Sequence, residues 1–237
     1  MNRNLLLSGG PGHDFAATNE AVARLLDRQG SRTTVVDEPA EVVARLREAE
    51  LGHSPPFSLL TVNALHWGMD TPRYAHLRPT QARHLGDDDA QVIESFVRRG
   101  GGLLALHTAV ICFDAQPRWR SLLGASWNWE TSSHPPWGPV AARVTPAGRA
   151  HPLTAGLDDF VIEDEAYGFL DEMDGLTPLL TTAHGGRDHP LLWAREVGRG
   201  RVVTDLLGHD ASSTEHPAHR TILSRAAAWA GRAPVPS

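Results

Sequence analysis

The sequence has little cysteine and no long apolar run. Cys112 is the single cysteine among 237 residues, so no internal disulfide can form and a reducing cytoplasm is expected. The apolar stretch near the start, Leu5 to Leu7, is too short for the core of a signal peptide. No apolar run approaches the ~20 residues that a membrane helix needs. These absences predict a cytoplasmic protein with no membrane partner.

Positive charge is also scarce. Lysine and arginine together number 22 against 28 aspartate and glutamate residues, which gives a net charge of −6, and no basic cluster stands out. Proteins that bind duplex nucleic acid neutralise phosphates with clustered lysine and arginine. The composition therefore excludes nucleic acid as an expected partner.

Histidine and tryptophan are abundant instead, with 13 and 7 residues. The most informative stretch is Gly100 to Gly102, followed by the apolar run Leu103 to Leu106 and then His107. The short, unbroken apolar run is typical of a strand buried on both faces of a parallel sheet. In open α/β sheets, ligands bind beyond the carboxyl ends of the strands. The pattern therefore places His107 where chemistry usually occurs.

The remaining patterns predict alternating strands and helices in the first half of the chain. Apolar runs predict strands at 4–8, 33–37 and 57–62, and helical periodicity predicts helices at 15–30, 39–50 and 87–99. In the second half, short alternating segments predict strands, several of them antiparallel, at 127–130, 140–144, 160–162, 179–182, 191–195 and 201–207. We predict an α/β, flavodoxin-like three-layer sandwich with a mostly parallel sheet and antiparallel additions in the C-terminal half. It forms one domain over 1–232, with a frayed tail at 233–237.

Four histidines follow predicted strand ends. They are His13, His66, His107 and His209. Because the carboxyl ends of parallel strands share one edge of the sheet, we expect these imidazoles to gather there. The glycine-rich loop before His13 has neither the lysine of a P-loop nor the dinucleotide fingerprint, so nucleotide binding is rejected.

Short motifs in a fixed order resemble the trehalose-utilisation (ThuA-like) family, which has the class I glutamine amidotransferase-like fold. The motifs are Gly9-Gly10 with His13, Asn63 to Trp67, Gly100 to Ala109, Ser133 to Pro136, Asp164 to Tyr167, His189 to Trp193, Gly200 to Val202 and Leu207 to Asp210. The amidotransferases carry cysteine at the sharp turn where this chain has His107. That difference, and the missing G-x-S-x-G pattern, argue against a glutaminase.

The resemblance implies an enzyme of carbohydrate catabolism acting on trehalose, a related disaccharide or an oxidised 3-keto glycoside. The candidate catalytic residues are His107 as base or ligand, Glu165 as acid–base partner and His209 as a second proton-handling group. The candidate substrate-binding residues are His13, Asn63, His66, Trp67, His134, Tyr167 and Asp210. Trp67, Trp137 and Trp193 are candidates for the pocket wall. Cys112 is expected to be a buried small side chain.

Two alternatives remain open at this point. A metal-dependent hydrolase or lyase would hold Zn²⁺ or Mn²⁺ on His107, Glu165 and His209, with His216 in reserve. No compact metal motif such as H-E-x-x-H is present, so these ligands would have to converge from separate loops. The second alternative is a non-catalytic sugar-binding or assembly module, since a fold can keep a pocket without chemistry. A homo-oligomer is compatible with each of these interpretations.

Overall fold

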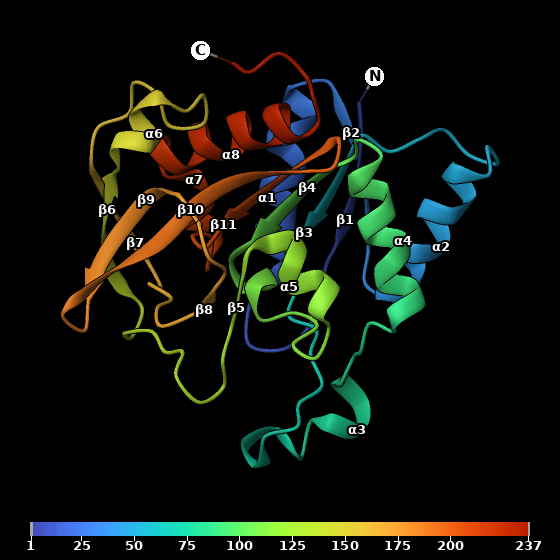
Figure 1. The fold of residues 1–237 in the computed structure, drawn as a ribbon, viewed down its shortest axis with the longest axis horizontal. Helices are drawn as coiled ribbons and strands as arrows, with labels where there is room; N and C mark the ends of the chain where they lie inside the picture. Colours follow the sequence, from blue (N-terminus) through green and yellow to red (C-terminus); the bar gives the residue numbers. More distant parts are fainter. Residues whose placement is uncertain (1, 237) are drawn as a thin grey trace.

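The computed structural model describes residues 2–236, and its centre is one nine-stranded sheet (Figure 1). The strand order is β2-β1-β3-β4-β11-β10-β9-β6-β7. The parallel part consists of β1 (Asn2–Leu7), β2 (Ser31–Val36), β3 (Leu59–Val62), β4 (Gly102–Leu106) and β11 (Gly200–Asp205). The antiparallel part consists of β10 (Arg187–Val197), β9 (Pro178–His184), β6 (Gly138–Val144) and β7 (Phe160–Asp164).

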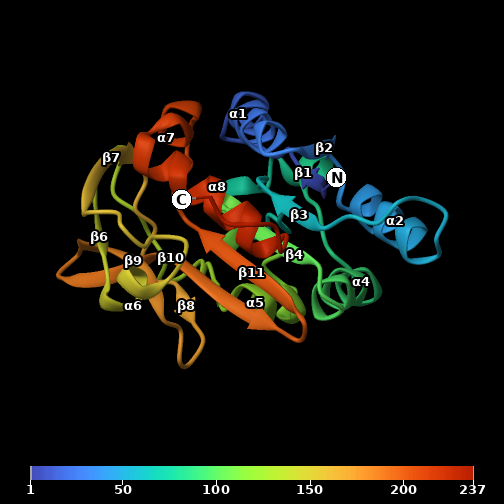
Figure 2. The same ribbon diagram turned by 90° about the horizontal axis from the view of Figure 1, so that it is seen from above.

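Helices cover the sheet on both faces, which makes three layers (Figure 2). One face packs on α1 (Phe15–Arg28), α7 (Ala211–Glu215) and α8 (Pro217–Ala230), and the other on α2 (Pro39–Glu50), α4 (Asp87–Arg98) and α5 (Pro117–Leu123). Alternate residues of β4 pack on opposite faces of the sheet. Leu103 packs on the side of α2, α4 and α5, and Leu104 packs on the side of α1 and α8. This two-sided burial explains the unbroken apolar run of β4, and the predicted fold class is confirmed.

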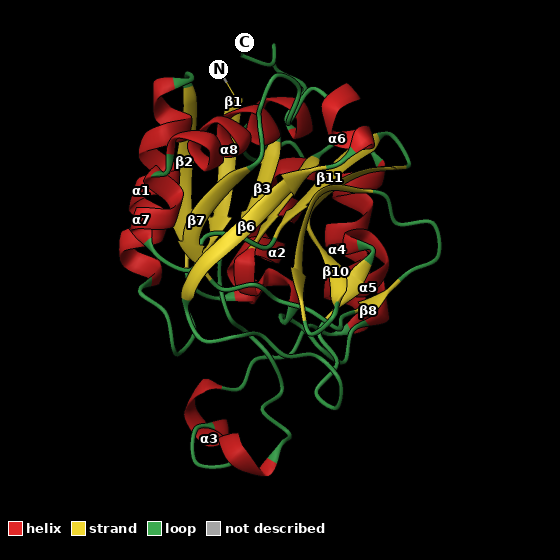
Figure 3. Ribbon diagram, turned by 90° about the vertical axis from the view of Figure 1, so that its left-hand side faces the viewer, coloured by secondary structure: helices red, strands yellow, loops and turns green. Residues whose placement is uncertain are grey.

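Smaller elements shape the edge where the parallel strands end. A 3₁₀ turn, η2 (His107–Val110), follows β4, and β5 (Ala125–Ser126) pairs with β8 (Asp171–Glu172). The segment after β3 leaves the body of the molecule and carries η1 (Pro72–Tyr74) and α3 (Arg78–Gln81), as Figure 3 shows. The short helix α6 (Pro146–Ala150) lies next to β9 and β6.

Two local predictions need correction. The stretch 127–130 is not a strand, because Trp127 donates its backbone N–H to Val110 and Asn128 then caps a turn through its side chain. The expected tail is attached up to Pro236, whose carbonyl accepts a hydrogen bond from the Arg225 guanidinium. Ser237 lies outside the described residues. None of the described helices is long and apolar enough to cross a membrane.

Candidate functional site

His107 occupies a sharp turn directly after β4. Its φ is +45°, a left-handed conformation that is costly for a residue with a side chain and that recurs at functional turns. Its Nδ1 lies 2.8 Å from the carbonyl oxygen of Leu206. Because a carbonyl only accepts, Nδ1 donates this hydrogen bond, and Nε2 is left to face the other side chains of the site. The side chain is only 1% exposed, so it lies beneath the surface of the site.

Three further side chains meet His107 at the same edge of the sheet. Candidate ligand atoms of His13, His107, Glu165 and His209 all lie within 4.8 Å of one another. Glu165 Oε2 is 3.3 Å from His209 Nδ1 and 3.6 Å from His107 Nε2. The Tyr167 hydroxyl lies 3.1 Å from His107 Nε2. We call His13, His107, Glu165 and His209 the histidine–glutamate cluster.

The loop that carries His13 depends on glycine. Gly10 has a φ of +108°, and a Cβ there would lie 2.2 Å from the carbonyl oxygen of Leu65. Only glycine tolerates both the conformation and the close approach. This tight loop between β1 and α1 therefore brings His13 to the cluster.

The loop that carries His209 depends on Asp164, which the sequence interpretation did not single out. Its side chain is 1% exposed and accepts hydrogen bonds from the backbone N–H groups of Gly208 (2.8 Å) and His209 (3.2 Å) and from the Ser213 hydroxyl. Because Asp164 ends β7 directly before Glu165, one short segment holds two members of the cluster together. Its signal in the sequence is three consecutive acidic residues at a strand end, a pattern that more often marks a solvated edge.

The cluster changes the protonation of its members. Burial, together with the neighbouring His107 and His209, lowers the pKa of His13 to about 4. Burial alone would raise the pKa of Glu165, but His107 and His209 outweigh it and hold the carboxyl well below its usual range. The Glu165 carboxylate raises the pKa of His209. Burial and the same carboxylate raise the pKa of Tyr167 well above its usual value, so its hydroxyl keeps its proton.

A cavity of about 430 Å³ opens above the cluster, and its wall is aromatic. Tyr167 contacts Trp127 with ring centroids 5.3 Å apart, and Trp127 contacts Trp129 at 6.1 Å. Trp129 stacks on Trp67 at 5.9 Å, and Trp67 contacts Tyr74 at 5.1 Å. The wall therefore runs without interruption from the cluster to the projecting segment after β3.

Several predicted site residues line this cavity. They are His13, Trp67, His134, Glu165, Tyr167 and His209. His134 Nδ1 lies 3.6 Å from Glu165 Oε1, on the side away from the other histidines. Trp127 and Trp129 were missed as wall residues because their alternation with Asn128 and Glu130 is typical of a strand.

Other predicted residues do not line this cavity. The Asn63 amide donates to Thr18 and Asn19 in the interior. His66 donates from Nε2 to the Ser8 carbonyl at 2.8 Å and faces a separate small cavity lined by Gly9, Gly10 and Arg83. His66 shares the expected edge of the sheet, but the loop at Gly9 and Gly10 separates it from His13.

Four more candidates lie outside the lining of the cavity. Asp210 caps α7 by accepting from the Ser213 N–H, and Trp193 is buried with its indole N–H on the Leu123 carbonyl. Trp137 is 48% exposed and does not line the cavity, and His216 stacks on Phe160 at 5.4 Å. Cys112 is buried, as expected, and burial raises the pKa of its thiol to about 12, which excludes it as a nucleophile.

The cluster also fits a divalent cation. Both ring nitrogens of His13 are buried without a hydrogen-bond partner among the described residues. The His107 ring is fixed by its Nδ1–H bond to a carbonyl, the arrangement that usually orients a metal-binding histidine. Three imidazoles and one carboxylate are donors that suit Zn²⁺ or Mn²⁺.

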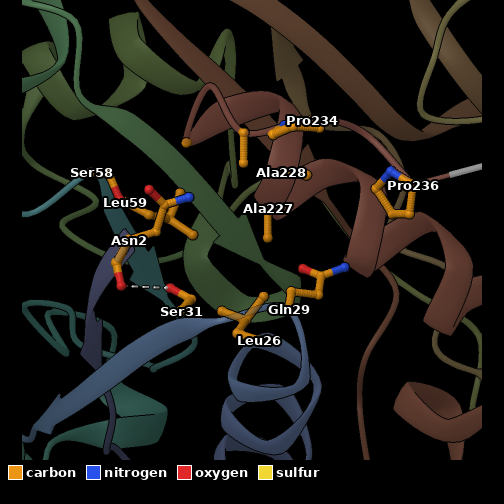
Figure 4. A pocket seen from close by; sticks show the side chains of 12 residues that line it. Asn2, Leu26, Gln29, Ser31, Ser58, Leu59, Ala227, Ala228, Pro234 and Pro236 are labelled. Atoms are coloured by element: carbon orange, nitrogen blue, oxygen red, sulfur yellow. Dashed lines mark hydrogen bonds between the residues drawn. The ribbon is translucent and has the colours of Figure 1, made fainter.

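A second cavity, of about 330 Å³, lies at the opposite edge of the sheet, where the parallel strands begin (Figure 4). Its lining contains Leu26, Leu59, Ala227 and Pro234, and no residue with a titratable side chain. The Ser31 hydroxyl there already bonds to the Asn2 carbonyl at 3.4 Å. We refer to these two cavities as the carboxyl-edge cavity and the amino-edge cavity.

Comparison with known proteins agrees with the fold and the ordered motifs. The profile of the ThuA family, described as trehalose utilisation, matches residues 3–230. This chain belongs to the ThuA family. A ThuA-like protein from Parabacteroides merdae has a similar structure, with a TM-score of 0.77, 16% identity, and coverage of 100% of this chain and 92% of the other. No curated protein matches the sequence.

Two other solved structures share the fold of this ThuA family member. A cytoplasmic protein from Salmonella typhimurium has a TM-score of 0.59 and 14% identity, with 98% of this chain and 97% of that chain covered. A β-galactosidase from Rahnella has a TM-score of 0.61 and 14% identity, with 98% of this chain but only 31% of that chain covered. At these identities the likeness concerns the fold alone. Membership of the ThuA family supports a role related to carbohydrate but specifies no activity or substrate.

Proposed function

We propose that this protein is an enzyme that processes a sugar derivative in the carboxyl-edge cavity. The observation that carries the proposal is the combination of Glu165 and His209 at the cavity floor with an aromatic wall beside them. Aromatic rings pack well on the apolar face of a sugar, and the cavity volume lies in the ordinary range for small-molecule sites. Trehalose, a related disaccharide or an oxidised 3-keto glycoside is the proposed substrate.

The reaction we favour is a proton transfer. A keto group acidifies the neighbouring C–H bond, so one acid–base pair is sufficient for isomerisation or for elimination of the glycosidic oxygen. Glu165 and His209 line the cavity and face each other at 3.3 Å, which suits exchange of a proton with the substrate. This chemistry needs no activated nucleophile, in keeping with the buried thiol of Cys112.

The role of His107 changes with its position. Its side chain is almost fully buried and does not line the cavity, so we propose that it positions Glu165 and Tyr167 rather than touching the substrate. This proposal replaces the direct acid–base role that its place in the sequence suggested.

A second candidate function is favoured by His13. Its two ring nitrogens, which have no partner among the described residues, and the convergence of ligand atoms from His107, Glu165 and His209 fit a Zn²⁺ or Mn²⁺ ion held by the histidine–glutamate cluster. Such an ion would polarise a substrate carbonyl or a bound water. Glu165 and His209 would then be ligands as well as cavity residues.

The experiment uses protein purified without an affinity tag and two measurements. Elemental analysis gives the metal content, and a panel of disaccharides and 3-keto glycosides, 3-keto-trehalose included, is tested for binding and turnover. We expect turnover of at least one sugar derivative. Turnover with a metal content near zero would support proton transfer without a metal ion. One bound ion per chain would instead support the second candidate, the Zn²⁺ or Mn²⁺ site. Binding without turnover across the panel would contradict an enzyme and favour the non-catalytic module.

The compartment remains a proposal as well. Two neighbouring structures from Salmonella typhimurium are described as cytoplasmic proteins. We propose the cytoplasm for this chain too, because a single buried cysteine is compatible with reducing conditions.

A further inference from the structure

The outer end of the carboxyl-edge cavity carries polar groups that the proposed reaction does not use. Trp67 is 2% exposed, and its indole N–H is buried without a hydrogen-bond partner among the described residues. The Thr71 hydroxyl is likewise buried without a partner among the described residues, and both residues line the cavity. The Trp127 indole N–H is also without a partner there, but it lies nearer the cluster, where Trp127 contacts Tyr167. A buried donor without a partner is costly, which points to a ligand atom that satisfies it.

Arg73 adds a positive charge at this outer end. It lines the cavity, and its Cζ lies 5.3 Å from the centre of the Tyr74 ring, which Trp67 contacts from another side at 5.1 Å. Among the described residues no carboxylate lies within 4.0 Å of the Arg73 guanidinium, whereas the nearby Asp70 pairs with Arg78 at 3.9 Å. Arg73 is therefore an exposed cation beside an unpartnered donor.

Acceptors at this part of the cavity are already occupied. The Ser132 hydroxyl donates to the Phe169 carbonyl and accepts from the Asn128 N–H. The Asp114 carboxylate, behind the wall, accepts from the Trp129 indole and from the Gly68 N–H. The groups left to bind a ligand at this end are the Trp67 indole N–H, the Arg73 guanidinium and the hydroxyls of Thr71 and Tyr74. This set matches the oxygens of an anion better than the hydroxyls of a neutral sugar.

We propose that the substrate carries a carboxylate or a phosphate on the part remote from the reacting group, and that Arg73 and Trp67 bind this anion. The proposal rests on the proposed function, since it extends the substrate of the same cavity. Five aromatic side chains, Tyr167, Trp127, Trp129, Trp67 and Tyr74, lead in succession from the histidine–glutamate cluster to Arg73. The anion therefore belongs to a different part of the substrate from the one at Glu165.

The test compares three probes by titration calorimetry: trehalose, trehalose 6-phosphate and a disaccharide that ends in a uronic acid. The wild type is expected to bind both anionic probes about tenfold more tightly than trehalose, because a charged acceptor roughly doubles the strength of each hydrogen bond. A preference for only one anionic probe identifies phosphate or carboxylate as the natural group. Raising the salt concentration should reduce the preference.

Variants assign the preference to this end of the cavity. Arg73→Gln should bring the three affinities within about twofold, and Trp67→Phe, which removes the N–H but keeps an aromatic ring, should lower the preference in part. Arg32→Gln, on strand β2 and outside the lining of the cavity, is the matched loss of one positive charge and should change nothing. Equal binding of neutral and anionic probes to the wild type, or a preference that survives in Arg73→Gln, would overturn the inference while the proposed function stands. Failure of all sugars, neutral and anionic, to bind would overturn both.

Discussion

The two cavities at opposite edges of the sheet are similar in size and different in chemistry. The amino-edge cavity holds about 330 Å³ and the carboxyl-edge cavity about 430 Å³. In the first, Gln29 donates to the Ser224 carbonyl at 3.3 Å and Ser58 donates to the Arg3 carbonyl at 3.2 Å, and its lining, within the part of the chain that the structure describes, contains no buried polar side-chain atom without a partner. In the second, both ring nitrogens of His13 and the Trp67 indole N–H have no partner among the described residues.

This difference indicates that buried polar groups without a hydrogen-bond partner, rather than cavity volume, distinguish the candidate site. Folding normally gives each buried polar atom a partner, so groups left without one are kept for another purpose. The partnerless atoms of His13 and Trp67 lie where the parallel strands end, as the architecture leads one to expect. The following predictions test this contrast, from the largest expected effect to the smallest.

Removing the charge of Glu165 should have the largest effect. Glu165→Gln keeps the shape of the side chain but removes the carboxylate that faces His107 and His209. We expect turnover of the active sugar derivative to fall by about 10²- to 10⁴-fold, the usual contribution of an acid–base group, with the circular dichroism spectrum unchanged. Gln29→Ala in the amino-edge cavity is the control and should stay within about twofold of the wild type. Equal effects of the two substitutions would remove the distinction between the cavities.

Removing the Asp164 side chain should lower the free energy of unfolding more than removing a side chain that caps one short helix. Asp164→Ala leaves the N–H groups of Gly208 and His209 without their buried acceptor, so we expect a loss of about 3 kcal/mol or more in chemical denaturation. Asp210→Ala removes only the cap of α7 and should cost about 1 kcal/mol. If both variants lose the same stability, Asp164 does not hold the His209 loop in the manner described.

The aromatic wall should affect binding more than chemistry. Trp129→Ala removes the ring that stacks on Trp67, and we expect KM to rise about tenfold with little change in kcat. Trp137→Ala, an exposed tryptophan outside the cavity lining, is the matched control and should leave both constants unchanged. A fall in kcat with KM unchanged would place Trp129 at the chemistry instead of at the wall.

Substitution of His219 should have the smallest effect and offers a contrast with His13: the ring nitrogens of both are buried, but only those of His219 have partners among the described residues. Its Nδ1 lies 2.9 Å from the Ser213 carbonyl and its Nε2 lies 3.2 Å from Asp205 Oδ2. Burial alone would lower the pKa of His219, but Asp205, with help from Asp164 and from the Ser213 backbone, raises it above the usual 6.5.

A raised pKa in the folded state has a definite consequence for stability. The contribution of His219 is fully present below pH 6.5 and is lost as the pH rises through the folded-state pKa. The difference in Tm between the wild type and His219→Gln should therefore be larger at pH 6 than at pH 9. A difference that is constant with pH, or that grows toward pH 9, would contradict the charged pair.

Sequence patterns predicted the features that depend on local periodicity and on chain direction. The run Leu103 to Leu106 could only be a doubly buried strand, and the residue after it had to lie at the carboxyl edge. The pairing of Glu165 with His209 was reached through the family resemblance, because β7 and β11 are not neighbours in the sheet and no spacing rule joins them.

The errors have physical causes that a single sequence does not reveal. His66 follows a strand end like His13, but the tight turn at Gly9 and Gly10 separates the two rings. The alternation around Trp127 suggested a strand, whereas tertiary contacts with Val110 turn the chain instead. In both cases the three-dimensional path of a loop decides the outcome, and loop paths leave weak periodic signals.

The central claim is that a sugar derivative binds at the carboxyl-edge cavity with its reacting part beside Glu165 and His209. The most direct measurement is a crystal structure of Glu165→Gln soaked with the sugar derivative that the wild type turns over. The account predicts a sugar ring against Trp129 and Trp67, with a polar atom within hydrogen-bond distance of His209. Density for the sugar in the amino-edge cavity, or in the carboxyl-edge cavity but far from His209, would contradict it.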